Sequence, residues 1–316
     1  MKLIKYLGII ALASVLLSCG TKSVKEITKK TREMEERKLT VEVFKGEAAT
    51  VNSYLFSNGK SLAVMDVLRS SENAQELVKL IKSKELPLEY ILISHGHPDH
   101  FTGMAVLKKE FPTAKIYVGS KEVKQDIIGF SNWMESVGWW EKEPNLKPKS
   151  DTNPNGFDYE NQINVLKSNT ITLNGGGTLE IETLENATEA GHISTFFSKD
   201  LNALFSSDLC YNGVHLWFGS GVEKEHIRQW EIELKKLKKR FGTSDISVYP
   251  GHGDKSTVKL FDVDLKYISD FKSAVASSTT KEQVIEKMKA LYPTWKQEDF
   301  LLPMSAEYQI SIKDKN

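Results

Sequence analysis

Cysteine is scarce in this sequence, because Cys19 and Cys210 are the only two among 316 residues. A framework of disulfides within the chain is therefore excluded. A surplus of charge is also missing, since 42 lysines and arginines balance 42 aspartates and glutamates. The chain thus lacks the electrostatic footprint of a nucleic-acid-binding protein, and we expect no such partner. With 40% hydrophobic residues it can still bury a sizeable core.

The N-terminus lacks an apolar run long enough to cross a bilayer comfortably, but it has the layout of an export signal. Two lysines lie within the first five residues, Tyr6 to Leu17 is almost wholly apolar, and the small residues Ser18 and Gly20 flank a cysteine. A basic start, a short apolar run and small residues at a cleavage site are typical of secretion. We therefore predict a signal peptide over residues 1–18.

Cys19 refines this prediction. The stretch LLSC, which ends at Cys19, resembles the bacterial lipoprotein signal, where cleavage before the cysteine leaves that residue lipid-modified. The attached acyl chains would anchor the protein to a membrane. Residues 19–38, dense in both charge signs, would follow as a solvated tether. The predicted location is the cell envelope, on the periplasmic side or at the outer membrane. The alternative is an ordinary signal peptide with an incidental cysteine.

From residue 39 the pattern changes to short apolar runs separated by turn residues, which predict strands. Helices alternate with them, and Ser71 or Asn73 and then Ser120 are suitable caps. We therefore predict one mixed α/β domain over residues 39–316. The predicted strands cover residues 39–44, 50–56, 61–67, 88–94, 115–118, 162–166, 170–173, 179–184, 193–197, 203–206 and 246–249. The predicted helices cover residues 71–82, 98–111, a stretch after 120, 223–240 and two closing helices within 261–291.

Two segments interrupt this alternation. Residues 130–159 hold three of the six tryptophans together with several prolines, and their lack of a clean period predicts an irregular excursion. The excursion either covers a cleft and binds an apolar group or packs its aromatic side chains onto the sheet. The triple glycine at 175–177 lacks the Lys-Ser/Thr of a phosphate-binding loop, so a hairpin turn is the better interpretation.

Side chains of the metal-ligating type crowd the end of one predicted strand. The stretch HGHPDH follows Ser94 and contains four of them: His95, His97, Asp99 and His100. The two histidines that are two residues apart would share one side of an extended segment, and the proline would start a helix that carries the other two groups. Imidazole and carboxylate are ligands of zinc and related metals. Because burying so many ionisable groups is costly without a compensating cation, the cluster predicts a metal site.

Further candidate ligands stand at the ends of later strands. His192 precedes the strand at 193–197, Asp208 ends the run ALFSSD, and His252 lies in GHGD after the strand at 246–249. Glycine beside the two histidines allows sharp backbone turns that leave room for a cavity. Each residue alone is compatible with an ordinary loop position, but together they form a series.

This series resembles that of the metallo-β-lactamase superfamily. HGHPDH matches the His-x-His-x-Asp-His motif of the family, and the three later residues match its later ligands. The resemblance covers nearly all of residues 39–253. It implies an α/β fold of the four-layer αββα sandwich type with a dinuclear zinc centre. Two zinc ions per chain are expected, although other divalent metals are compatible with the ligands.

The resemblance also implies how the ligands are divided. One metal would be held by His95, His97 and His192, and the second by Asp99, His100 and His252, with Asp208 between the two. Asp66, at the end of the run SLAVMD, matches an aspartate that follows an early strand of the family. It would orient a ligand imidazole, unless it is simply a turn residue.

Hydrolysis is the implied chemistry, because two cations activate a bridging water and polarise the oxygen of the bond that it attacks. Asp99 would orient this nucleophile or carry its proton. Tyr211 lies three residues after Asp208, a spacing similar to that of a tyrosine in acyl-homoserine-lactone lactonases that donates to the substrate; the alternative is a packing role. For His215, at the expected rim, a structural hydrogen bond is predicted.

The ligand set resembles that of glyoxalase II, lactonases and related thioesterases more than that of β-lactam hydrolases. One β-lactamase subclass has cysteine where Asp208 stands, and another lacks a bridging carboxylate there. We predict cleavage of an ester, lactone, thioester or similar bond in a small-molecule substrate. The alternatives are β-lactam hydrolysis, a mononuclear iron dioxygenase that shares the histidine motif, and a non-catalytic metal-dependent binding protein. The oligomeric state is left open.

Overall fold

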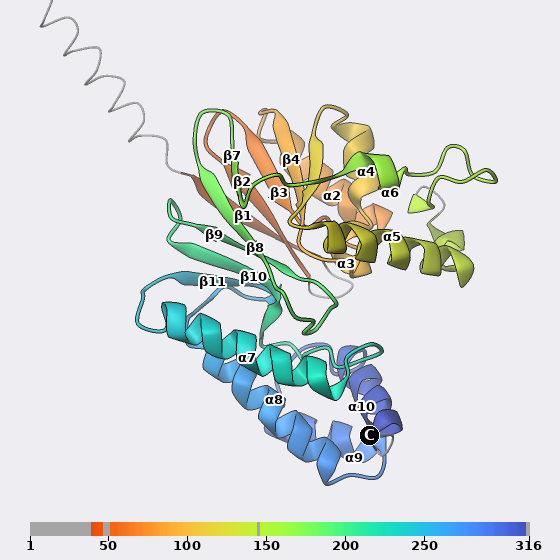
Figure 1. Cartoon of the computed structure of the whole chain (residues 1–316), viewed down its shortest axis with the longest axis vertical. Coiled ribbons are helices and arrows are strands. Elements are labelled where there is room, and N and C mark those ends of the chain that lie inside the picture. The colour runs from red at the N-terminus through yellow and green to blue at the C-terminus, as the bar shows by residue number, and fades with distance from the viewer. Residues whose placement is uncertain (1–38, 47–50, 144–145, 314–316) are drawn as a thin grey trace, which may run out of the picture. The chain divides into compact units, whose positions relative to one another are not determined.

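Two six-stranded sheets stack against each other, and helices cover the outer face of each (Figure 1). This computed structural model describes residues 39–46, 51–143 and 146–313. The predicted signal peptide, Cys19 and the tether up to residue 38 lie outside the described residues. The four-layer αββα sandwich is confirmed, and it comprises two mixed sheets flanked by helices.

The first sheet has its strands in chain order. The first three are antiparallel neighbours, and β3 to β6 run parallel. Parallel strands need crossover connections, and the helices between them cover the outer face of this sheet. Its strands are β1 (Thr40–Lys45), β2 (Asn52–Ser57), β3 (Leu62–Met65), β4 (Leu88–Ile93), β5 (Lys115–Val118) and β6 (Ile163–Val165). The connecting helices are α2 (Ser71–Lys82), α3 (Pro98–Phe101), α4 (Met104–Glu110), α5 (Lys121–Ser136), the 3₁₀ turn η1 (Trp139–Lys142) and α6 (Tyr159–Gln162).

The second sheet is mostly antiparallel, with one parallel pair between β10 and β11. The triple glycine forms the predicted hairpin turn between β7 and β8, because all three residues have positive φ, which glycine adopts without strain. The strands lie in the order β12 (Ser256–Thr257), β11 (Ser247–Gly253), β10 (Ala203–Asn212), β9 (Ser194–Ser198), β8 (Thr178–Thr183) and β7 (Thr170–Thr172). Its helices are α7 (Lys224–Phe241), α8 (Leu260–Ala276), α9 (Lys281–Leu291) and α10 (Leu301–Ile312).

Three hydrophobic cores separate the four layers. The middle core packs side chains of both sheets together, such as Phe56 and Met65 from the first and Phe196 and Phe205 from the second. A second core lies between the first sheet and helices α2, α4 and α5, and a third lies between the second sheet and helices α7 to α10. Because strand side chains alternate between the two faces, each sheet contributes to two cores.

The structure differs from the sequence predictions at several helices. The helix predicted over 98–111 is divided, because the N–H of Gly103 donates to the carbonyl of Leu68 at 3.0 Å and leaves the helical ladder. A Cβ atom at Gly103 would lie 1.9 Å from the carbonyl oxygen of Val67, so only glycine permits this approach. The helix that begins after Ser120 continues to Ser136, inside the predicted irregular excursion. Helix α10 was not predicted. None of the helices in the described part of the chain has the length and apolarity needed to cross a membrane.

Candidate metal centre

The predicted ligands meet where strands of both sheets end. The segment after β4 crosses from the first sheet to the second, since Ser94 accepts a hydrogen bond from the N–H of Ser194 at 2.9 Å and His95 forms a β-bridge with Ile193. On the other side, His252 in β11 forms a bridge with Val51. These pairings bring residues that are more than 150 positions apart in the sequence to one edge of the sandwich.

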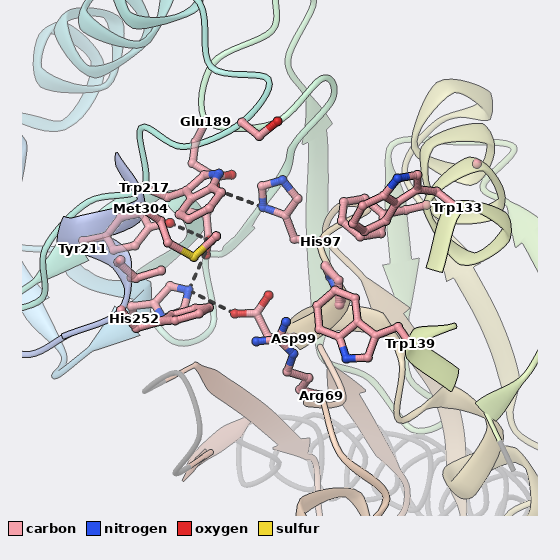
Figure 2. Close-up of a pocket in the computed structure, with 17 residues that line it drawn as sticks. Arg69, His97, Asp99, Trp133, Trp139, Glu189, Tyr211, Trp217, His252 and Met304 are labelled. Atoms are coloured by element: carbon pink, nitrogen blue, oxygen red, sulfur yellow. Dashed lines mark hydrogen bonds and ion pairs between the residues drawn. The ribbon is translucent and has the colours of Figure 1, made fainter. Parts of the chain in front are cut away.

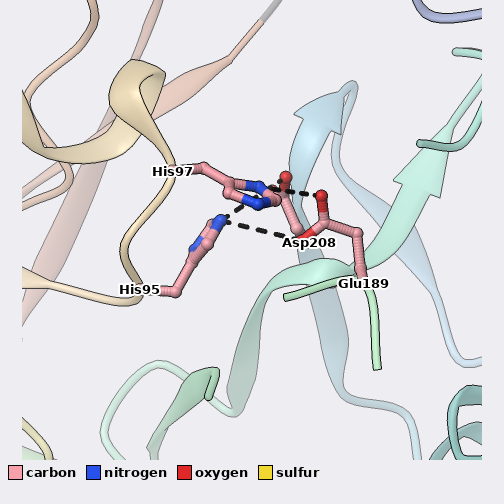
Figure 3. A group of neighbouring side chains, drawn as sticks. All are labelled: His95, His97, Glu189 and Asp208. Atoms are coloured by element: carbon pink, nitrogen blue, oxygen red, sulfur yellow. Dashed lines mark ion pairs between the residues drawn. The ribbon is translucent and has the colours of Figure 1, made fainter. Parts of the chain in front are cut away.

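The first cluster contains His95, His97, Glu189 and Asp208, whose ligating atoms all lie within 4.8 Å of one another. Figure 3 shows the four side chains pointing toward a common centre. Nδ1 of His97 lies 2.9 Å from Oε1 of Glu189, and Nε2 of His95 lies 3.8 Å from both Glu189 and Asp208. Two imidazoles and two carboxylates are a suitable ligand set for a divalent metal.

The second cluster contains Asp99, His100 and His252, again within 4.8 Å. Asp208 connects the two clusters, because its Oδ2 lies 3.8 Å from Nε2 of His95 in the first cluster, while its Oδ1 and Oδ2 each lie 3.2 Å from an Nε2 of the second cluster, in His100 and His252. One carboxylate thus faces both groups of ligands. This arrangement is consistent with a dinuclear metal site.

The local backbone explains how these side chains converge. His97 is the N-cap of α3 with an extended conformation, and Pro98 occupies the first helical turn, so the chain turns abruptly between the two clusters. Ser207 has a φ of 49° at an irregular point of β10, which redirects the strand just before Asp208. Gly251 leaves the space that the Asp208 carboxylate occupies, because a Cβ atom at this position would lie 1.8 Å from Oδ1 of Asp208.

Asp66 orients one histidine of each cluster, His100 directly and His95 through Ser94. Its Oδ2 accepts a hydrogen bond from Nδ1 of His100 at 2.8 Å and another from the hydroxyl of Ser94 at 2.8 Å. Because that hydroxyl donates to Asp66, its oxygen is left to accept from Nδ1 of His95 at 2.9 Å. A proton on Nδ1 of each histidine fits these contacts, and Nε2 of each then faces the centre.

Four of the atoms that face the centre have no hydrogen-bond partner in the described part of the chain. Among the buried side-chain atoms of the described residues, Nε2 of His95, Nε2 of His100, Oε2 of Glu189 and Oδ1 of Asp208 make no hydrogen bond. Unsatisfied polar atoms are rare in a protein interior because each costs free energy. Four of them aimed at one another fit a site that is completed by metal ions.

The electrostatics of the two clusters are strongly coupled. Burial, reinforced by His100, holds the pKa of His95 well below its ordinary value. Burial also acts to lower the pKa of His100, but the carboxylates of Asp208 and Asp66 outweigh it and raise that pKa well above the ordinary value. Burial would raise the pKa of Asp208, yet His100 and His252 hold it well below the usual range. Asp208 is therefore ionised and available as a ligand.

His192 is the one predicted metal ligand that the structure does not bring into either cluster. Its Nδ1 lies 2.8 Å from Oδ2 of Asp126, and its side chain is 34% exposed. Glu189, three residues earlier in the same loop, points into the first cluster instead. Glu189 was not predicted as a ligand, because a single glutamate in a loop has no distinguishing pattern beyond its closeness to His192.

Both clusters open onto a cavity of about 550 Å³. Figure 2 shows His97, Asp99 and His252 at one wall and the aromatic side chains around them. The excursion predicted over 130–159 contributes to this wall, and helix α10 supplies two apolar residues. The lining aromatic and apolar side chains are Phe130, Trp133, Trp139, Tyr211, Trp217, Phe300, Leu301 and Met304.

Tyr211 and His215 occupy different surroundings. The hydroxyl of Tyr211 lines the cavity and donates to Oδ2 of Asp208 at 2.8 Å. Burial, followed by the charge of Asp208, raises the pKa of Tyr211 well above its usual value, so the hydroxyl stays protonated. His215 is buried away from the cavity, and its Nδ1 lies 2.7 Å from the hydroxyl of Tyr267, which is the structural hydrogen bond that was predicted.

Comparison with known families gives one match that covers most of the chain. A sequence profile described as the metallo-beta-lactamase superfamily matches residues 46–252, which include every residue of both clusters. Individual relatives match over much shorter stretches. A probable metallo-hydrolase of Streptococcus pyogenes is 34% identical over 71 residues, which are 22% of this chain and 29% of the relative.

Two further relatives are named for one activity. A probable hydroxyacylglutathione hydrolase of Schizosaccharomyces pombe is 40% identical over 63 residues, which are 20% of this chain and 25% of that protein. Hydroxyacylglutathione hydrolase 1 of Vibrio vulnificus is 28% identical over 75 residues, 23% of this chain and 28% of the relative. The matched stretches thus span little more than a quarter of the length of these relatives.

Solved structures resemble the fold over a larger part of the chain. A metallo-beta-lactamase family protein from Thermus thermophilus aligns with a TM-score of 0.60 and 15% identity, covering 88% of this chain and 93% of the other. A metallo-beta-lactamase from Pontibacter korlensis aligns with a TM-score of 0.50 and 15% identity, covering 74% and 95%. At this level of identity the similarity concerns the fold alone.

Proposed function

The chain belongs to the metallo-beta-lactamase superfamily and is a metallo-hydrolase of that family, and from this premise we propose a dinuclear zinc enzyme that cleaves an ester, thioester or lactone bond. The observation that carries this proposal is the pair of ligand clusters that share Asp208 and open onto an aromatic cavity. The two relatives named hydroxyacylglutathione hydrolase support an acyl substrate, although each is matched over only part of its length.

Bound divalent cations would supply Lewis acidity and a water of lowered pKa, which are the requirements for hydrolysis at neutral pH. The protein's own groups complete the chemistry. Asp99 lines the cavity with a side chain that is 16% exposed, and Oδ2 lies 3.6 Å from Nε2 of His252. Its carboxylate is positioned to orient the attacking water and to accept a proton from it.

Tyr211 is the proposed hydrogen-bond donor to the substrate. Its hydroxyl is anchored on Asp208 and faces the same cavity, and its raised pKa keeps the proton in place. The hydroxyl has a single proton, so it would have to turn that proton from Asp208 to the substrate oxygen, where a neutral donor stabilises the negative charge that develops during attack.

The cavity walls favour a substrate with an apolar body. Aromatic side chains from the 130–159 segment, from the loop after β10 and from the C-terminal region surround the opening to the metal ligands (Figure 2). Burial of each methylene group contributes about 0.8 kcal/mol, so an acyl chain that fills this cavity gains binding energy with its length. We infer an acyl or aryl group larger than acetyl.

Arg69 provides a single positive group on this apolar wall. It is the only lysine or arginine among the described residues that line the cavity, and its guanidinium lies 4.5 Å from the ring centre of Trp139. None of the described carboxylates pairs with it within 4.0 Å, so its charge is available for a ligand. An anionic group on the substrate, such as a carboxylate, would complement it.

The test uses the full chain, purified in detergent and loaded with zinc. Esters, thioesters and lactones of increasing acyl length are assayed, with β-lactams and phosphodiesters for comparison and His97→Ala as the control. We expect kcat/KM to rise about fourfold per added methylene until the cavity is full. We also expect Arg69→Gln to raise KM about 10-fold or more for an ester that carries a carboxylate but to leave its methyl ester unaffected.

Two results would contradict the proposal. One is a zinc-loaded protein that turns over none of these acyl compounds, and the other is an activity that survives in His97→Ala. A single bound iron with consumption of oxygen would instead identify a dioxygenase. The metal content therefore tests the proposed metal centre, and the turnover of the different compounds tests the proposed substrate class separately.

The proposed location is the cell envelope, with the protein held there by a lipid on Cys19. Support comes from the sequence pattern of residues 1–19 alone, since this segment lies outside the described residues. Export in this form would place the enzyme outside the cytoplasm, where it would meet its small-molecule substrate. Labelling with a radioactive fatty acid tests it, because Cys19→Ala should abolish incorporation while the wild-type chain retains it.

A further inference from the structure

We propose that Glu189, and not His192, is the third protein ligand of the first metal site, beside His95 and His97, with Asp208 shared between the sites. This assignment rests on the proposed metal centre and departs from the ligand division that the family resemblance implied. It changes that site from three imidazoles to two imidazoles and a carboxylate.

Glu189 is buried in a way that a carboxylate rarely is. Only 2% of its surface is exposed, and no described lysine or arginine lies within ion-pair distance of it. Oε1 contacts Nδ1 of His97 at 2.9 Å, whereas Oε2 has no hydrogen-bond partner and lies 3.8 Å from Nε2 of His95. Burying a carboxylate without a compensating group is costly, and a cation between these atoms supplies that compensation.

His192 has the opposite environment. A third of its side chain is exposed, and its ring is held by Asp126 on helix α5 through the 2.8 Å contact at Nδ1. A hydrogen bond at Nδ1 would also suit a ligating histidine, but His192 belongs to neither group of converging ligand atoms among the described residues. Its ring nitrogens are therefore not among the ligand atoms that converge in either cluster.

The backbone between the two residues explains the choice. Glu189 and His192 lie in the same loop between β8 and β9, and Ile193 is fixed against His95 by a β-bridge. The N–H of Thr188 donates to the carbonyl of Ala190 at 3.0 Å, which turns the chain tightly at Glu189. This turn directs the glutamate inward, while Gly191 brings His192 close to Asp126.

The consequence is a more negative site. Glu189, Asp208 and Asp99 together contribute three negative charges, whereas the division implied by the family would contribute two. Carboxylate ligands are harder than imidazole and suit manganese better. The first site should therefore prefer zinc over manganese less strongly than a site of three imidazoles would. The ligand type can therefore be read from metal binding itself, independently of activity.

The experiment compares matched glutamine variants of the full chain, purified in detergent. Wild type, Glu189→Gln and His192→Gln are loaded with zinc, desalted and analysed for metal per chain, and their zinc affinities are measured by competition with a chromophoric chelator. Glu189→His is the rescue variant, because it restores a ligand of another type at the same position. Circular dichroism and thermal unfolding of the zinc-free proteins show that each variant is folded.

We expect wild type and His192→Gln to retain two zinc ions with affinities within about twofold of each other. Glu189→Gln should lose one zinc ion or weaken it about 100-fold or more, which is beyond the usual effect of an orienting residue. Glu189→His should regain the second ion and prefer zinc over manganese more strongly than wild type does.

Loss of a zinc ion from His192→Gln would overturn the assignment, as would retention of both ions at wild-type affinity in Glu189→Gln. Wild-type stoichiometry reports separately on the proposed centre, because a wild-type protein that binds no zinc would refute the dinuclear site together with this assignment. Zinc binding by wild type with the reversed pattern in the variants would refute the assignment alone.

Discussion

Replacement of Asp66 by asparagine should weaken metal binding at both sites, although Asp66 touches neither metal position. Its carboxylate accepts hydrogen bonds from Nδ1 of His100 and from the hydroxyl of Ser94, which in turn accepts from His95. The other carboxylate oxygen, Oδ1, accepts a hydrogen bond from the backbone N–H of Ser94 at 2.9 Å. An amide presents one oxygen and one NH₂ group, so it can accept at only one of these two positions. Where NH₂ faces His100, the histidine must move its proton to Nε2, and a protonated Nε2 cannot bind a metal.

The expected loss of metal affinity follows from the hydrogen bonds by which Asp66 orients the ligand histidines. Loss of a carboxylate that orients a ligand histidine typically costs 10- to 100-fold in metal affinity, or about 1.4 to 2.8 kcal/mol. Asparagine is the suitable replacement, because Asp66 is buried with a φ of 57° and asparagine tolerates this left-handed conformation better than most residues. The mismatched buried hydrogen bonds should also lower the free energy of unfolding of the metal-free protein by about 1 to 3 kcal/mol.

Chelator competition with zinc measures the affinity, and urea unfolding of the zinc-free protein measures the stability. Asp126→Asn is the matched control, because Asp126 also contacts Nδ1 of a histidine, but that histidine is His192. Zinc affinity should be unchanged in the control. Affinity of Asp66→Asn within twofold of wild type would refute the reasoning, since it would mean that the proton positions of His95 and His100 do not depend on Asp66.

Three further perturbations have defined outcomes. Tyr211→Phe should lower kcat about 10- to 100-fold while both zinc ions remain bound, because it removes the proposed hydrogen-bond donor to the substrate oxygen; unchanged kcat at full metal content would argue against a role for the hydroxyl. Zinc affinity should fall with decreasing pH, beginning above the ordinary histidine value of 6.5, because neighbouring carboxylates raise the pKa values of His100 and His252 and zinc must displace their protons. Calorimetry in buffers of different ionisation enthalpy should detect that proton release, and its absence would contradict the raised values. Trp230→Ala should lower the free energy of unfolding by about 3 to 5 kcal/mol in urea titrations, because a fully buried indole is removed; a loss below 1 kcal/mol would be inconsistent with its burial.

The strand and helix pattern was largely predictable because it depends on local chemistry. Every predicted strand has a counterpart in the structure, and Ser120 caps helix α5 as expected by accepting a hydrogen bond from the N–H of Val123. Errors occurred where tertiary contacts override a local pattern. Gly103 leaves the helical ladder to bond with Leu68, and α10 has no strong amphipathic period although it packs against α9 and the third core.

The sequence alone determined the chemistry of the centre. HGHPDH places four ligand-type side chains within six residues, so their convergence follows from the turn between a strand and a helix and needs no long-range information. The same local density identifies a metal site and, through its order with Asp208 and His252, the family. The closeness of these residues in the sequence is sufficient to predict the metal site.

The tertiary structure alone decided which residue of the 184–193 loop lies in the first ligand cluster and which side chains line the cavity. The sequence predicted His192 as a ligand and gave no signal for Glu189, whereas the bridge between Ile193 and His95 and the turn at Glu189 place the carboxylate in the first cluster. Arg69, the aromatic side chains of α5 and η1, and residues of α10 likewise meet at one cavity although they are far apart in the chain. Their meeting depends on how the helical layers pack across the sheets, and this long-range packing has no signature in any short stretch of sequence.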